Sequence, residues 1–203
     1  MSLTEFLGGM FGTRAIEIVA ATFGLINVVL IIRRSMWNYP FGIAMVILYC
    51  WIFYEARLYS DALLQIFFLV IQVFGIFWWL KGRDDTGLVM ARDLSPQSAG
   101  MAAMIAMIGT AALGYSMNTW TDAALPYWDA CTTVLSVIAQ ILMARRYLQS
   151  WLVWITVDVL AIGIYLTKDL TPTAALYALF LCLSIAGYLR WKNSMAKGVA
   201  VTA

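Results

Sequence analysis

The chain has 203 residues, of which 63% are hydrophobic and 12% are charged, with a formal net charge of +2. Soluble domains usually carry about 25% charged residues, so these charges are too few to coat a water-soluble globule. The small net charge gives no reason to expect nucleic acid as a partner. The absence of histidine and the three scattered cysteines exclude a Ser-His or Cys-His hydrolase and predict no metal site, cofactor or disulfide framework. The composition predicts a lipid bilayer as the solvent.

Seven stretches are apolar enough to form membrane helices, which need about 20 residues each. The first follows a short amphipathic lead-in and ends at the arginine pair Arg33-Arg34. A polar stretch, 81–97, separates the third from the fourth and is predicted to be a loop. The predicted spans are 15–32, 39–54, 62–80, 98–116, 128–143, 151–166 and 172–191.

The basic residues predict the orientation of these spans. One side would hold Arg14, Arg57 and Lys168. The other side would hold Arg33, Arg34, Lys81, Arg83, Arg92, Arg145, Arg146, Arg190, Lys192 and Lys197. Positive charge is retained in the cytoplasm, so we expect the N-terminus outside and the C-terminus in the cytoplasm.

An internal repeat is the most informative feature of the sequence. Shifted by 112 residues, segment 33–79 aligns with 145–191 without a gap, and the matches include Arg33/Arg145, Arg34/Arg146, Gly75/Gly187 and Trp79/Trp191. Spans 1–3 would therefore repeat as spans 5–7. Span 4 would add one crossing, so that the second copy crosses the membrane in the same direction as the first. The sequence predicts an all-α membrane protein in a parallel 3+1+3 arrangement, with parts at 1–80, 81–124 and 125–203. Transporters built from such repeats bind substrate near the bilayer midplane, between the repeats.

Polar side chains recur at helical spacing inside these spans, where they should face a cavity or one another. Span 1 offers the weaker candidates Glu17, Gly24 and Asn27, and the repeat places Tyr177 and Ser184 of span 7 at the positions of Gln65 and Gln72. The candidate site residues are Gln65 and Gln72 in span 3, Asp129 in span 5, and Trp151, Trp154 and Asp158 in span 6. Together they suit a small, flat, cationic and polyhydroxy solute, because tryptophan faces attract cations and carboxylates accept from hydroxyls.

Several of these residues have an alternative interpretation. Gln65 and Gln72 could bridge helices, Trp151 could belong to the aromatic belt at the membrane boundary, and Asp129 could cap its helix. An isolated carboxylate at Asp158 requires a proton, a partner or a cationic ligand. A membrane enzyme using Asp129 and Asp158 as acid and base, and a receptor or structural subunit, are the competing functional classes.

The sequence resembles the PnuC family of vitamin transporters. The resemblance is carried by WNYPFGI (37–43), LYSDALLQIFF (58–68), residues 125–158 with the WxxWxxxD pattern, and GYLRW (187–191). It implies uptake of nicotinamide riboside across the bacterial inner membrane, down a gradient that cytoplasmic phosphorylation maintains, with a SWEET-like fold and a homotrimer. We expect facilitative transport without ion coupling, and proton coupling through Asp158 is the alternative. By position, Trp154, Asp158, Gln65 and Gln72 would contact the substrate. Relatives that carry nicotinamide riboside often have Asn at the positions of Asp158 and Gln72, so thiamine or riboflavin remains an alternative substrate.

Overall fold

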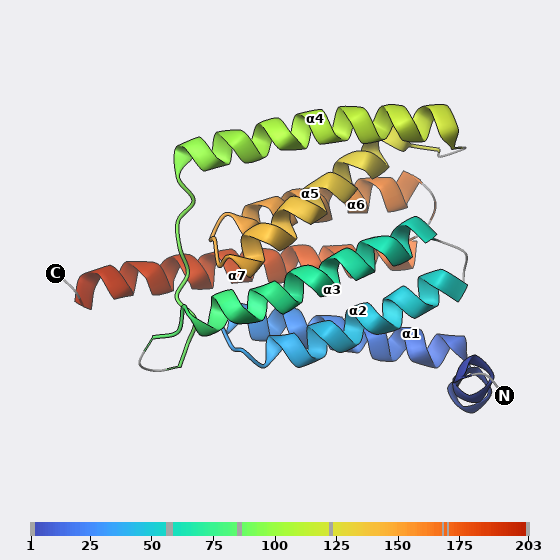
Figure 1. Cartoon of the computed structure of the whole chain (residues 1–203), viewed down its shortest axis with the longest axis horizontal. Coiled ribbons are helices and arrows are strands. Elements are labelled where there is room, and N and C mark those ends of the chain that lie inside the picture. Colours follow the sequence, from blue (N-terminus) through green and yellow to red (C-terminus); the bar gives the residue numbers. More distant parts are fainter. Residues whose placement is uncertain are drawn as a thin grey trace. The chain divides into compact units, whose positions relative to one another are not determined.

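The computed structural model describes residues 3–55, 59–84, 87–121, 124–167, 169 and 171–201. This part of the chain is almost entirely helical, with one helix at each predicted span (Figure 1). The helices are α1 (Leu3–Ile32), α2 (Asn38–Glu55), α3 (Tyr59–Leu80), α4 (Pro96–Trp120), α5 (Pro126–Ala144), α6 (Ser150–Thr167) and α7 (Thr171–Val201).

Most helix ends lie within four residues of their predicted positions. Helix α4 begins at Pro96 because Pro suits the first turn, and the Ser95 hydroxyl accepts a hydrogen bond from the Ser98 amide at 3.2 Å. Two helices extend beyond their predicted spans. Helix α1 begins at Leu3, so the lead-in is helical, while its apolar span is Ala15–Ile32 as predicted. Helix α7 continues past Trp191 to Val201, and no proline interrupts this stretch.

Six of the seven helices in the described part of the chain are long and apolar enough to cross a membrane. The exception is α2, whose 18 residues include Asn38, Glu55 and three tyrosines. A multi-pass helical membrane protein is therefore confirmed, whereas a seventh crossing by α2 stays a prediction. Of the residues used to predict orientation, Arg57 and Lys168 lie outside the described residues, as do the side chains of Arg14 and Lys197.

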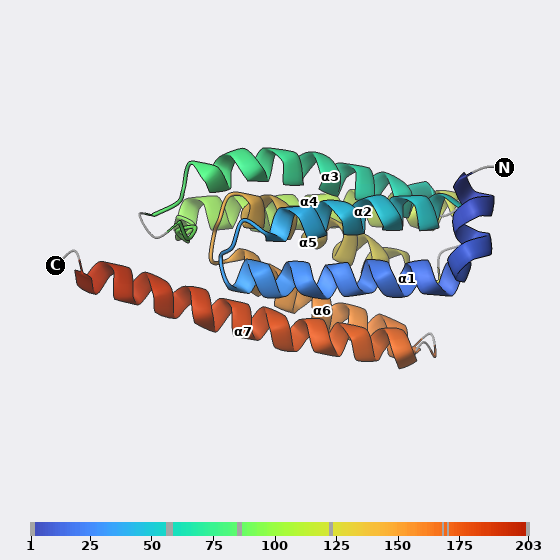
Figure 2. The same cartoon turned by 90° about the horizontal axis from the view of Figure 1, so that it is seen from below.

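The chain forms two compact units, Met1–Val89 and Met90–Ala203. In the first unit α2 packs against both α1 and α3 (Figure 2). In the second unit α5 packs against α4 and α6, and α6 also packs against α7. Helix α4 approaches α5 closely because Gly114 leaves room for the ring of Tyr127, and a Cβ on Gly109 would stand 3.1 Å from Val134.

Each unit contains the same turn between two of its helices. Arg34 follows α1 with φ 57°, and Arg146 follows α5 with φ 67°. In both turns the arginine amide donates to a carbonyl three residues back, and the next amide donates five residues back, at 2.8–3.0 Å. These bonds define a Schellman motif, which usually has glycine at the left-handed position. Each guanidinium also donates to a backbone carbonyl at 3.3 Å, from Arg34 to Val89 and from Arg146 to Met90.

Both units also bury an equivalent aromatic pair. Tyr39 of α2 meets Trp79 of α3 edge to face, with ring centroids 5.5 Å apart at 84°. Trp151 of α6 meets Trp191 of α7 in the same way, at 5.6 Å and 87°. All four rings are buried, and the two pairs correspond under the 112-residue shift. The turns and the pairs support the internal repeat at the level of individual contacts.

Candidate functional site

In the second unit, Asp158 lies in the middle of α6 with 3% of its surface exposed. The Ser184 hydroxyl on α7 donates a 3.0 Å hydrogen bond to its Oδ2. A carboxyl group inside an apolar helix pair is costly unless it is bonded, and such groups mark solute pathways in membrane proteins. The sequence predicted that Asp158 needs a proton, a partner or a cationic ligand, and Ser184 is one such partner.

Trp154 lies one helical turn before Asp158, so the two side chains are neighbours on one face of α6. Its indole is half-buried, which leaves part of the ring accessible. A flat aromatic surface beside a carboxyl group offers a cation two attractive partners. This pair is the chemical centre of the candidate site in the second unit.

Trp151 serves a different purpose from Trp154. Its side chain is 2% exposed and packs on Gly187 of α7, where a Cβ would stand 2.6 Å from the indole ring. With Trp191 it forms the buried aromatic pair, and its Nε1 has no hydrogen-bond partner among the described residues. The interpretation as a membrane-boundary belt residue was therefore wrong, because the ring is enclosed between two helices. A contact of Trp151 with a solute stays a prediction.

Gln65 and Gln72 lie two turns apart on one face of α3. Gln72 is 6% exposed, and its Oε1 lies against Gly42 of α2. Gln65 is half-buried, and its Oε1 is buried with no partner within the described residues. Sequence reasoning missed Gly42, for which the only available signal was its alignment with Trp154 in the repeat.

Asp129 lies in the first turn of α5, but not at the cap position where the sequence allowed for it. The cap position belongs to Leu125, which makes no side-chain bond there. The Asp129 carbonyl accepts from the hydroxyls of Thr132 at 3.0 Å and Thr133 at 2.8 Å. These threonines bond their own backbone, as is common in membrane helices. A role for Asp129 in binding stays a prediction.

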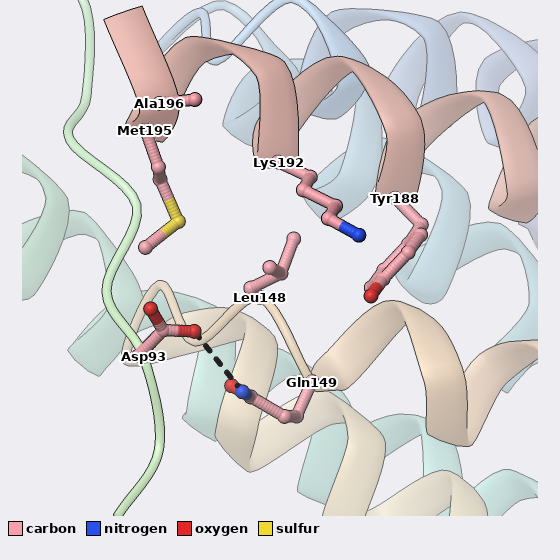
Figure 3. Close-up of a pocket in the computed structure, with 7 residues that line it drawn as sticks. All are labelled: Asp93, Leu148, Gln149, Tyr188, Lys192, Met195 and Ala196. Carbon is pink, nitrogen blue, oxygen red and sulfur yellow. Dashed lines mark hydrogen bonds between the residues drawn. The ribbon is translucent and has the colours of Figure 1, made fainter. Parts of the chain in front are cut away.

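A hollow of about 390 Å³ lies where the last turns of α7 meet the loop before α4 and the α5–α6 turn (Figure 3). The Gln149 amide ties these loops together: its Nε2 donates to Asp93 Oδ1 at 3.2 Å, and its Oε1 accepts from the Leu94 amide at 2.9 Å. The hollow is lined by Asp93, Leu148, Gln149, Tyr188, Lys192, Met195 and Ala196. None of the predicted site residues lines this hollow.

The described residues contain no group of three His, Cys, Asp or Glu side chains able to hold a metal ion. What they do contain is a bonded carboxyl group, a partly accessible indole and buried amides, all inside apolar helices. This combination defines a helical membrane transport protein, since polar groups at such depth typically line a solute pathway.

The particular family follows from comparison with known proteins. The chain matches the nicotinamide mononucleotide transporter family over residues 14–193, and it belongs to that family. The family is one of transporters, as the sequence predicted in preference to an enzyme.

Individual relatives agree with this assignment. The nicotinamide riboside transporter PnuC of Escherichia coli is 28% identical over 88% of this chain and 85% of its own length. The PnuC of Neisseria mucosa is 28% identical over 85% of this chain and 70% of its own. The riboflavin/roseoflavin transporter RibM of Streptomyces davaonensis is 24% identical over 86% of this chain and 83% of its own length. A crystal structure of the vitamin B3 transporter PnuC superposes with a TM-score of 0.71 at 28% identity, covering 86% of this chain and 79% of that one.

Proposed function

We propose that this protein carries nicotinamide riboside into the cell across the bacterial inner membrane by facilitated diffusion, without ion coupling. The family and the PnuC relatives support the substrate. The observation that carries the proposal is that the half-buried Trp154 lies one helical turn before the buried Asp158 on α6. Nicotinamide riboside is a flat pyridinium cation with a ribose, so a tryptophan face and a carboxyl group complement its two halves.

Trp154 and Asp158 would be the principal contacts, with Gln65 and Gln72 contributing amides from the first repeat. In this proposal the indole face attracts the pyridinium ring, and the carboxyl group accepts from ribose hydroxyls or pairs with the positive ring. The half-buried indole of Trp154 could give such a solute room to stack.

The finer architecture also belongs to the proposal. We infer a SWEET-like 3+1+3 arrangement with repeats at 1–80 and 125–203, joined by 81–124, and a passage lined by both repeats. The equivalent arginine turns and aromatic pairs support the repeat. We further infer a homotrimer with external N-termini and cytoplasmic C-termini, the latter from the retention of basic loops in the cytoplasm.

Riboflavin is the second candidate substrate, because RibM is among the relatives. Its flat ring system could also stack on Trp154. It carries no positive charge, however, so it would gain less from Asp158 than a pyridinium does. Thiamine, which is a flat cation, is a third competitor on chemical grounds.

The test is counterflow in proteoliposomes loaded with unlabelled vitamin. We expect labelled nicotinamide riboside to accumulate, with less exchange of thiamine or riboflavin, and an imposed pH gradient to leave the rate unchanged. Trp154→Ala should weaken binding about tenfold, since an indole–cation contact contributes roughly 0.5–2 kcal/mol. Exchange of riboflavin or thiamine in place of nicotinamide riboside would overturn the substrate, and acceleration by the gradient would overturn uncoupled transport.

A further inference from the structure

Three residues from three helices of the first unit meet at one point. Asn27 comes from α1, Gly42 from α2 and Gln72 from α3. A Cβ built on Gly42 would collide with Gln72 Oε1 and would stand 3.0 Å from Asn27 Oδ1 and 3.2 Å from its Cγ. Both amide groups therefore lie against the bare backbone of Gly42, and only glycine leaves them this space.

The hydrogen bonding of this cluster is incomplete within the unit. Asn27 Oδ1 is buried and has no hydrogen-bond partner among the described residues. Gln72 is itself buried. Leaving a buried amide unbonded in an apolar span is costly, so a polar cluster at this depth indicates a polar solute that completes it.

The repeat shows that this cluster is particular to the first half. Under the 112-residue shift, Asn27 corresponds to the buried Ala139, Gly42 to Trp154, and Gln72 to Ser184. The second half therefore has a large ring where the first has no side chain, and small residues where the first has amides. The first half is suited to hydrogen bonding and the second to stacking.

We propose that Asn27 and Gln72, with Gly42 keeping the space between them open, recognise the carboxamide of the substrate and reject the corresponding carboxylate. This inference rests on the proposed function, and it adds Asn27 and Gly42 to the residues that determine specificity. A carboxamide donates through its N–H groups and accepts through its oxygen, and Asn and Gln side chains complement both. A carboxylate only accepts, and its charge is costly to bring into an apolar span without a cation.

The test uses purified full-length protein, with calorimetric binding of nicotinamide riboside and of its carboxylate analogue, nicotinic acid riboside. Asn27→Leu removes the amide and keeps a similar size in an apolar span. We expect it to weaken binding of the amide about tenfold, the loss of roughly 1.4 kcal/mol of hydrogen bonding, and to narrow the preference for the amide over the acid. Unchanged affinity and unchanged preference in Asn27→Leu would overturn the inference.

Gly42→Ala provides a second variant, with Gly163→Ala as its matched control. A Cβ on Gly163 of α6 meets nothing within 4 Å, so that variant should bind like the wild type. Gly42→Ala should lose affinity about as much as Asn27→Leu, and binding equal to that of Gly163→Ala would contradict the inference. If Gly42→Ala does not fold, the Asn27→Leu result decides. A wild-type protein that binds neither riboside would overturn the proposed function itself, whereas wild-type binding with insensitive variants would overturn the inference alone.

Discussion

The two compact units are alike where the backbone bends and different where polar groups are buried. Both close a helix with a left-handed arginine, and both bury an edge-to-face aromatic pair at 5.5–5.6 Å. Inside, the first holds the amides of Asn27 and Gln72, whereas the second holds Trp154 and the Asp158–Ser184 bond. Two units with matching turns and aromatic pairs therefore bury different polar groups, so the features they share do not determine the chemistry inside each one.

The largest expected effect tests whether the aromatic pairs have equal structural roles. Trp151→Ala should destabilise the protein by about 3–5 kcal/mol, as buried Trp truncations do, and Tyr39→Ala should cost a similar or slightly smaller amount. Thermal and denaturant unfolding in detergent would measure both. Trp37→Ala is the control, because that ring is 70% exposed and should matter little. If Trp151→Ala were as mild as Trp37→Ala, the buried pair would not be a structural element.

A smaller effect concerns the bond that only the second repeat has. Ser184→Ala removes the single hydrogen bond found for Asp158 within the described residues. Leaving that carboxyl group unbonded should cost about 1–3 kcal/mol of stability. In an Asp158→Leu background the same serine substitution should cost much less, so a double-mutant cycle would show a coupling energy of that order. Additive effects of the two substitutions would show that the bond contributes nothing.

The smallest effect should be the same in both repeats. Arg34→Gly and Arg146→Gly each place glycine at a left-handed position, which should stabilise the fold by about 1 kcal/mol. Each also removes one 3.3 Å guanidinium hydrogen bond, which should cost about the same amount of stability. We therefore expect two small and similar changes in melting temperature. A large change in one variant only would show that the two turns are not equivalent.

The helices could be predicted from the sequence because apolar length and flanking arginine, proline and tryptophan residues mark each span locally. The extension of α7 was missed because a polar segment without helix breakers looks like a loop in a hydropathy argument. The polar residues of α3 and α6 were predicted from spacing. Their partners were harder, because the rotation of packed helices decides which side chains meet, and only the repeat hinted at Ser184. Gly42 was missed because its role lies in the space it leaves, and its alignment with Trp154 was the only signal for it.

The two left-handed arginines link biogenesis to the finished fold. During membrane insertion, a loop with basic residues beside a span is retained on the cytoplasmic side of the bilayer. Here the same residue also ends the preceding helix and fastens its guanidinium to the chain near Val89 or Met90. Under the proposed orientation, the arginines that keep these loops in the cytoplasm during synthesis later form the turn between two helices, so a neutral substitution would weaken the orientation signal while changing the stability of the finished fold little.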